Sequence, residues 1–416
     1  MRTRIFTTKR VTALALALAL VGATLALPAA AADEDAATFG DAITRGKVLL
    51  NLRYRYENVD DDSFDDTGQA STLRFALGYA TREWKGFSVT AEFQSVLDLG
   101  LENRHNDKGA GGDWNGVSDR PVIADPSITG FYQGFLKWRF ASENTFLKFG
   151  RQPILLDNVR FVGNVGWRQF HQSFDALRFG TGLIPGVTLT YAYVWNQNRI
   201  FGDQKPMGTH LLNLGGKLGK NNTLTGYGYL VDYERLADSG ASTLTFGVRD
   251  HGNVPFSSWK LLYDAEIARQ SDAGDNPGNV DAWYHRAGVG GTFGGFTAKL
   301  AYEVLEGEPG KGAFSTPLAT LHAWNGWADI FLKTPANGLE DFYLSLAYRA
   351  AAWKFAAIYH DFSANTGGAS YGSEWDLLAS YTTSWKQTFA LKAAFYDADE
   401  YSRDVSKVWA YTSWKF

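Results

Sequence analysis

Four arginines lie close together in the sequence between residues 146 and 179: Arg151, Arg160, Arg168 and Arg178. A guanidinium group is planar, stays charged, and donates a fork of N–H groups that matches both oxygens of a carboxylate. Several such groups at one constriction would favour anions over cations. The stretch is long enough to fold inward as a loop, so its chemistry predicts anion recognition in a narrow passage.

Further cations recur at alternate positions of other segments, where successive strand side chains would point to opposite faces. Those on the face assigned to the interior are Arg53, Arg55, Arg74, Lys137, Arg139, Lys148, Lys299, Arg349 and Lys354. The carboxylates that share these faces are Glu57, Glu92, Asp264, Glu266 and Glu303. Two interpretations stay open: a cationic filter, or a water-filled interior of mixed charge in which these groups pair.

A second group of residues combines aromatic rings with polar atoms: His322, Trp324, Trp327 and Asp329. Aromatic faces stack on the apolar edges of sugar rings, and the polar atoms can hydrogen-bond to sugar hydroxyls. The alternative is that the rings belong to an aromatic girdle at a membrane interface, as in other membrane barrels. Because both interfaces of any such barrel carry aromatic girdles, the girdle is slightly favoured.

Patterns typical of catalytic and metal sites do not emerge. The seven His form no HExxH motif, there is no Cys, and His171 near Asp175 is expected to be structural. The acidic segments Asp60–Asp66 and Asp272–Asp281 match no EF-hand spacing, so we expect solvated loops rather than calcium or lipopolysaccharide-bridging sites. We expect no enzyme, no cofactor and no bound metal.

Strands are the elements that would position these groups, because apolar and polar residues alternate with period two as far as the C-terminus. The segment Leu49–Glu57, for example, alternates throughout. The predicted strands are 48-57, 71-81, 86-97, 129-140, 145-152, 172-180, 186-196, 210-218, 223-233, 242-251, 258-268, 282-292, 295-305, 340-349, 352-362, 374-384, 386-397 and 406-416.

The connections alternate between short turns, such as Arg82–Lys85, and long polar loops, such as 98-128, 153-171 and 306-339. This asymmetry is typical of periplasmic turns and extracellular loops. The apolar stretch Leu321–Leu332 could add another strand, but an even strand number favours a loop there. We predict an all-β fold: a transmembrane antiparallel up-and-down β-barrel of about 18 strands, with a soluble sandwich as the alternative.

The two ends of the chain support an exported barrel. Residues 1-32 combine a basic segment, an apolar core and an Ala-Ala-Ala site, and predict a cleaved signal peptide before a single barrel domain at 33-416. No later apolar run is long enough for a spanning helix. The terminal strand, with Trp414 and Phe416 on one face, resembles the assembly signal of outer-membrane barrels. Its expected partners are outer-membrane lipid, lipopolysaccharide and the barrel assembly machinery.

Removing the predicted signal peptide leaves 36 basic against 44 acidic residues, a formal charge of −8. An acidic chain is not expected to bind nucleic acid.

Two segments resemble the alginate-export family of outer-membrane porins. The first, FLKFGRQPILLDNVRFVGNVGWRQFHQSFDALRF (Phe146 to Phe179), carries the likeness in its GRQ, RFVG, WRQ and FDALR pieces. The second, HAWNGWADIFLKTPANGLEDFY (His322 to Tyr343), is similar to that family's H-x-x-N-G-W-A-D segment and its Gly-Leu-x-Asp return. The resemblance implies an 18-stranded barrel that passes an anionic uronic-acid polymer through an arginine-lined constriction. The residues at matching positions are Arg151, Arg160, Arg168, Asp175 and Arg178.

We therefore expect a channel of the bacterial outer membrane for facilitated diffusion or export of an anionic polysaccharide or oligosaccharide. The alternatives are an uptake porin for small anionic nutrients, a barrel enzyme and a structural membrane protein.

Overall fold

In the computed structural model the described residues are 35–415. The predicted signal peptide and Phe416 lie outside them. The first element is α2 (Phe39–Thr44), whose N-cap Thr38 accepts a hydrogen bond from the Asp41 amide. The amide of Arg82 donates to the carbonyl of Ala42, so α2 lies against the turn that follows the second strand.

Eighteen antiparallel strands form one sheet, and each pairs with the next along the chain. They are β1 (Lys47–Asp61), β2 (Gly68–Ala80), β3 (Phe87–Asp98), β4 (Thr129–Arg139), β5 (Phe146–Gln152), β6 (Ser173–Thr181), β7 (Val187–Asn198), β8 (Gln204–Lys217), β9 (Asn222–Val231), β10 (Thr243–Pro255), β11 (Trp259–Asp272), β12 (Asp281–Phe293), β13 (Phe296–Leu305), β16 (Leu339–Ala350), β17 (Trp353–Ser363), β18 (Ser370–Thr382), β19 (Gln387–Ala398) and β20 (Val405–Lys415).

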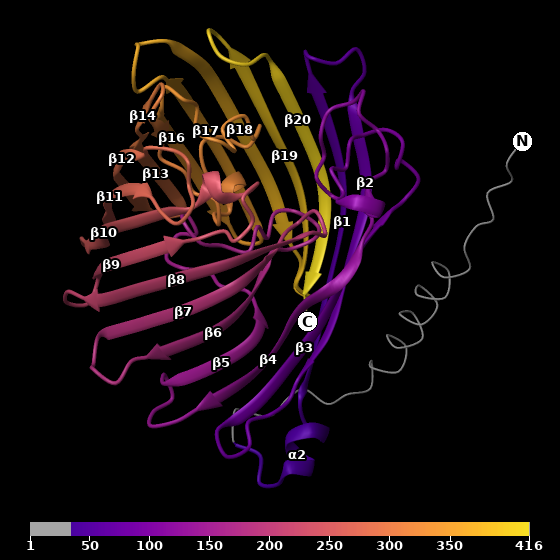
Figure 1. Cartoon of the computed structure of the whole chain (residues 1–416), viewed down its shortest axis with the longest axis vertical. Coiled ribbons are helices and arrows are strands. Elements are labelled where there is room, and N and C mark those ends of the chain that lie inside the picture. Colours follow the sequence, from indigo (N-terminus) through magenta and orange to yellow (C-terminus); the bar gives the residue numbers. More distant parts are fainter. Residues whose placement is uncertain (1–34, 416) are drawn as a thin grey trace, which may run out of the picture.

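The barrel closes because β1 also pairs with β20, from Asn51 opposite Lys415 to Asp61 opposite Val405 (Figure 1). Closure leaves no open sheet edge, which would expose unpaired backbone groups to lipid. The predicted 18-stranded barrel is confirmed. One boundary differs markedly: β8 begins six residues before its predicted start, because Gln204–Pro206 pairs with Asn196–Asn198 beyond a bulge in β7.

The remaining elements are short. β14 (Gly307–Glu308) and β15 (Gly312–Ala313) pair only with each other, and the 3-10 turns are η1 (Gly111–Asp113), η2 (Ser239–Ala241) and η3 (Leu321–Ala323). Apart from η3, the stretch 321–332 is irregular, so its assignment to a loop is confirmed. Within residues 35–415, no helix has the length and hydropathy needed to cross a membrane.

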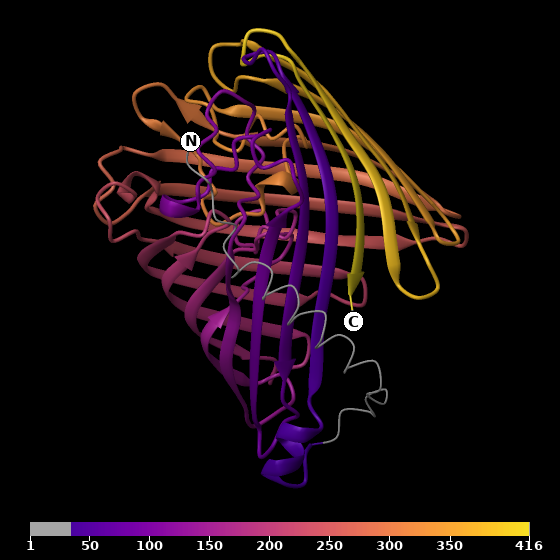
Figure 2. The same cartoon turned by 90° about the vertical axis from the view of Figure 1, so that its right-hand side faces the viewer.

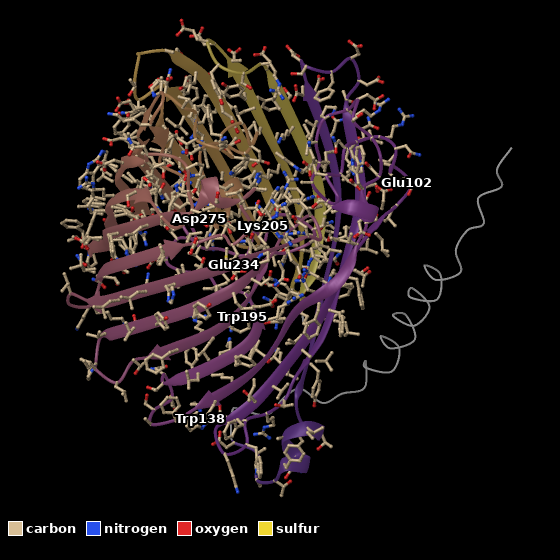
Figure 3. The ribbon with its side chains drawn as sticks, in the orientation of Figure 1. Glu102, Trp138, Trp195, Lys205, Glu234 and Asp275 are labelled. Atoms are coloured by element: carbon tan, nitrogen blue, oxygen red, sulfur yellow. The ribbon has the colours of Figure 1, made fainter. Side chains whose placement is uncertain are left out.

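The outer surface of the barrel is apolar. In β10, Phe246 is 60% exposed while its neighbour Thr245 is 3% exposed, as the alternation of strand side chains requires. Aromatic side chains stack outside the short-turn end, as Phe87 does on Trp138. Trp138 lies at this end of the barrel (Figure 3). An apolar band with aromatic residues at its border suits a bilayer. The exterior is therefore suited to a barrel that spans a bilayer.

The turns at this end are tight. Only Gly294 and Gly295 connect β12 to β13, and Gly294 adopts φ +57°, a conformation that a side chain would strain.

Three long loops fold into the barrel: 99–128, 153–172 and 306–338, which we call the interior loops (Figure 2). They share one buried apolar cluster with the wall, which includes Ile123, Ile154 and Leu318 from the loops and Phe174 and Trp409 from the strands. The second and third loops also touch through their backbones, since the amide of Gly163 donates to the carbonyl of Leu318 at 2.9 Å. The interior is therefore a packed core around which any passage must run.

Candidate functional site: the loop-filled interior

Two arginines of β1 hold the second interior loop. Arg53 donates from Nε to Gln169 Oε1 at 2.7 Å and from Nη1 to the carbonyl of Gly166 at 2.9 Å. Arg55 donates to the carbonyl of Trp167 at 2.7 Å and forms an ion pair with Asp125 of the first interior loop. Both side chains point inward, as the alternation predicts, but they serve as anchors for loops.

Arg160 joins the second interior loop to the opposite wall. Its Nε donates to Glu303 Oε1 of β13 at 2.8 Å, and its Nη2 donates to Asn325 Oδ1 of the third loop at 3.0 Å. Both charged side chains are almost wholly buried. An ion pair without access to water is closed to a passing ligand, so Arg160 acts as a structural fastening.

Arg168 forms a second fastening with the third interior loop. Its Nη2 lies 2.8 Å from Asp329 Oδ2, and Lys407 Nζ of β20 lies 3.5 Å from the same oxygen. Burial alone would raise the pKa of the Asp329 carboxyl, but its neighbours His322, Lys407 and Arg168 hold that pKa well below its ordinary value. Asp329 is therefore ionised at neutral pH.

Burial lowers the pKa of His322 well below its ordinary value, so the imidazole is neutral. Its Nδ1–H donates to Asp329 Oδ1 at 2.8 Å, and its Nε2 accepts from Lys392 Nζ at 2.5 Å. Lys392 Nζ also lies 3.6 Å from the ring centroid of Trp327 and 4.1 Å from that of Trp167. A cation enclosed by aromatic rings is stabilised by their quadrupoles.

The tryptophans of the third interior loop lie inside the barrel. Trp324 has the guanidinium groups of Arg160 and Arg286 at 5.3 and 5.4 Å from its ring centroid. Trp327 contacts Lys392, as described above. The alternative that placed these rings in a membrane-interface girdle is wrong, because the loop turns inward and the girdle is built from strand ends. Their predicted role in sugar binding stays a prediction.

Arg151 and Asp175 do not face the interior. They form a bidentate pair, with Nε–Oδ1 at 2.7 Å and Nη2–Oδ2 at 3.0 Å. In the β5–β6 register they share the outward face with Phe149 and Leu177, which are 59% and 39% exposed. The inward positions beside them belong to Gln152 and Phe174, both fully buried. The prediction that Arg151 and Asp175 belong to the passage is therefore wrong.

Arg178 belongs to a different group, which we call the cationic row: Lys137, Lys148 and Arg178. Lys137 stands directly opposite Lys148 in the β4–β5 register, and Lys148 directly opposite Arg178 in the β5–β6 register. None of the three forms an ion pair with a carboxylate anywhere in residues 35–415. Aromatic contacts partly compensate, since Lys148 Nζ lies 4.1 Å from the ring centroid of Phe135.

The remaining predicted cations are dispersed. Arg74 donates from Nη1 to Asn51 Oδ1 at 2.6 Å, and its Nη2 lies 3.4 Å from His171 Nδ1. The His171 ring also packs edge-on against the Tyr132 ring and does not pair with Asp175. Arg139 pairs with Glu83 and Asp35 near the periplasmic turns. Arg349 stands opposite Lys354 at the same end. Both open interpretations apply in different places. Charges are paired where the barrel wall contacts the interior loops, and cations without carboxylate partners lie on the wall away from these contacts.

Lys299 faces inward from β13, and no carboxylate among residues 35–415 pairs with it. Trp414 lies on the outward face of β20, where its indole donates to the carbonyl of Trp385 at 3.2 Å.

Sequence reasoning missed Lys392, Arg249 and Arg286. Each could have been found, because each occupies an inward position of an alternating segment. The expectation that no catalytic motif is present overlooked the letters GASYG at Gly368–Gly372, which match a nucleophile-elbow motif. That motif needs a strand, a sharp turn and a helix. Here Ser370 begins β18 of a hairpin, and its amide bonds to Glu400. The motif is therefore a coincidence of letters.

No protein-family model matches the chain, and no curated protein matches its sequence. Among solved structures it is similar to OpdK of Pseudomonas aeruginosa, solved with vanillate, at TM-score 0.70 and 16% identity over 89% of this chain and 98% of that one. OccK9 (OpdG) of the same organism gives TM-score 0.70 and 17% identity over 90% and 99%. OccAB2 of Acinetobacter baumannii gives 0.71 and 16% over 91% and 100%.

These likenesses concern the fold. They do not single out the alginate-export family, so that resemblance is supported only at the level of an outer-membrane porin. OpdK is described as an outer membrane protein, and the apolar exterior of this barrel agrees with that location. The chain therefore has the closed 18-stranded fold of outer-membrane porins.

Proposed function

We propose that the barrel is an uptake channel for small anionic nutrients, in particular compact carboxylates. The observation that carries this proposal is the cationic row on β4, β5 and β6, which faces the interior without carboxylate partners. Like charges directly opposite one another destabilise a sheet. An anion that passes the row would relieve this repulsion, and a cation would increase it.

A vestibule on the extracellular side supports small substrates with an apolar body. It is a cavity of about 570 Å³, and its lining includes Phe64, Ile200, Phe201 and Leu332. Two cations of its lining already form ion pairs with carboxylates: Arg403 pairs with Asp61 at 2.8 Å, and Arg168 pairs with Asp329 at 2.8 Å. Its lining also contains Arg199, which pairs with Asp203 at 2.5 Å, Lys407, which lies 3.5 Å from Asp329, and Lys108, which has no ion pair within the described residues. The vestibule thus combines apolar contact with cations, and we place the main charge selection at the cationic row, where no carboxylate is paired. OpdK, solved with vanillate, is a fold relative that holds such an aromatic carboxylate.

Export of a uronic-acid polymer is less well supported. A polymer pathway would need open arginines, yet Arg55, Arg160 and Arg168 are buried in ion pairs that fasten the interior loops. The cavities lined by the interior loops measure about 570 and 740 Å³, a size suited to small molecules.

The test is ion selectivity in planar bilayers, with Lys148→Glu and Arg178→Glu combined. Wild type is expected to prefer chloride over potassium, and the preference should weaken as salt rises, because screening lengths shorten. The double variant should lose or reverse it. Lys386→Glu, an exposed change in the β18–β19 turn, is the matched control and should conduct as wild type. A cation-selective wild type, or an unchanged double variant, would contradict the proposal.

A further inference from the structure

A second group of cations lines a hollow on the other side of the barrel, far from the cationic row in strand order. The hollow has a volume of about 430 Å³ and lies on the inward faces of β10 to β13, next to Tyr343 of β16. Its lining includes Lys220 and Asn221 of the short β8–β9 turn and no residue of the interior loops, so it lies between those loops and the short-turn end. We call it the glycine hollow, because two glycines of β12 line it.

Those glycines are Gly288 and Gly290, at successive inward positions of β12. A Cβ atom at Gly290 would stand 2.5 Å from the carbonyl oxygen of Ala298, so this glycine permits the close approach of β13. A Cβ atom at Gly288 would stand 3.3 Å from the Cβ of Ala301 and 3.7 Å from Arg286 Nη2. The missing side chain of Gly288 therefore leaves room beside Arg286.

The charges of the hollow are unbalanced. Its lining contains four cations, Arg249, Arg286, Lys299 and Lys220, against the single carboxylate of Asp264. Both arginines form ion pairs with Asp264, so one negative charge is shared by two guanidinium groups. Glu266 lies farther away, with its Oε2 3.7 Å from Arg249 Nε. Lys299 has no ion pair within the described residues.

The arginines are held in place before any ligand arrives. Arg286 donates from Nη2 to the hydroxyl of Tyr343 at 2.9 Å, and its guanidinium lies 5.4 Å from the ring centroid of Trp324. The Nε atoms of Arg249 and Arg286 are buried without a hydrogen-bond acceptor. Fixed donors lose little freedom when they bind a carboxylate, and the fork geometry favours its two oxygens.

We propose that the glycine hollow is a second binding site, for a small dianion such as a short dicarboxylate. The guanidinium groups would take one carboxylate, and Lys299, a separate point charge, would take the other. The volume suits a small molecule and excludes a polymer chain. Delivery of the dianion to this site rests on the proposed function, but binding itself can be measured without transport.

The direct test is binding of succinate to the purified protein in detergent, followed by saturation-transfer NMR. Wild type should bind succinate more tightly than acetate. Lys299→Met, which removes one charge and leaves no carboxylate unpaired, should weaken succinate binding about tenfold and acetate binding less. Gly288→Val, which fills the hollow without altering charge, should weaken both. Lys386→Met, an exposed change in the β18–β19 turn, removes a cation away from the hollow and should bind as wild type.

Equal succinate affinity in wild type and Lys299→Met would overturn this site, as would no succinate binding by wild type. Lys148→Glu/Arg178→Glu separates this proposal from the proposed function. If that variant keeps succinate binding but loses anion selectivity, both proposals stand. If wild type binds succinate in the hollow but is cation-selective, only the uptake function fails.

Discussion

At the scale of single residues, arginines from the same sequence segment have different roles: two are paired with carboxylates and one is not. Arg160 and Arg168 are buried against Glu303 and Asp329, where they fasten loops. Arg178, from the same sequence cluster, stands beside Lys148 with no carboxylate. Burying a charged pair has a large desolvation penalty, so such a pair is weak evidence for added stability. Breaking one by removing a single partner is costly, because the remaining charge is left uncompensated.

Arg160→Met should therefore lower the free energy of unfolding by about 3 to 5 kcal/mol, because Glu303 would stay buried without its partner. The measurement is denaturant unfolding of the folded barrel in lipid or detergent. Arg160→Met combined with Glu303→Gln should recover part of the loss. Arg139→Met, which breaks two more exposed ion pairs, should change stability by about 1 kcal/mol or less. Equal losses for the two single variants would contradict a fastening role for Arg160.

The ionised state of Asp329 predicts how acid affects the interior. Its pKa is depressed in the folded barrel, so its pair with Arg168 contributes fully above the unfolded value of about 3.9. That contribution is lost only as pH falls through the lower folded pKa. The Arg168–Asp329 pair should therefore hold the third interior loop equally well at pH 5 and pH 7, and the single-channel current of the wild type should show the same noise at both. Asp329→Asn, which lacks the pair, should show more noise at both pH values. A noise increase in wild type between pH 7 and 5 that is absent in Asp329→Asn would refute the assignment.

At the scale of elements, the strands form the wall and the interior loops decide how much of it a solute meets. The second and third loops meet at Lys392 of β19, whose ammonium lies among the rings of Trp167, Trp327 and Trp409. Such a desolvated cation–aromatic contact is worth about 2 kcal/mol or more. One strand residue therefore joins two loops that are far apart in the sequence.

Lys392→Met should loosen both loops while leaving the strands paired. We expect larger current fluctuations and a higher mean conductance in planar bilayers, because the loops would occupy their closed positions for less of the time. Lys386→Met, in the turn before the same strand, is exposed and should behave as wild type. If the folded Lys392→Met variant shows the same low current noise as the wild type, apolar packing alone holds the loops.

At the scale of the whole molecule, closure and the apolar exterior fix the barrel in a bilayer. The exterior is interrupted by the Arg151–Asp175 pair, to which Asn196 and Asn198 also donate, at 3.0 and 3.2 Å. These residues lie at the loop ends of their strands, where polar groups can reach the membrane surface. Assembly machinery and lipopolysaccharide remain proposed partners of this exterior.

The terminal aromatic residues of the sequence, Trp414 and Phe416, predict an effect on assembly. Phe416→Asp should reduce the amount of folded, heat-modifiable protein in the outer membrane, because a charge would end the aromatic terminal strand. Phe416→Tyr keeps the ring and should assemble as wild type. Equal folded amounts for the two variants would argue that the terminal residue is not part of the assembly signal.

The sequence by itself determined the barrel. Alternation with period two is a local property of each strand, and an even number of strands with short and long connections leaves a closed sheet as the main solution. The same alternation correctly turned Lys137, Lys148 and Lys299 toward the interior. Alternation identified the residues of the cationic row but could not show that they stand opposite one another. That alignment depends on the pairing register of neighbouring strands.

Only the tertiary structure decided which charges are paired. Arg160 meets Glu303 across 143 positions of sequence, and Arg55 meets Asp125 across 70, since loop packing brings them together. Arg151 and Asp175 became candidates through the family resemblance, whereas alternation from the inward Lys148 already puts Arg151, three residues later, on the outward face. Local rules set the direction of a side chain within a strand, whereas an ion pair between loop and wall depends on contacts that no local pattern encodes.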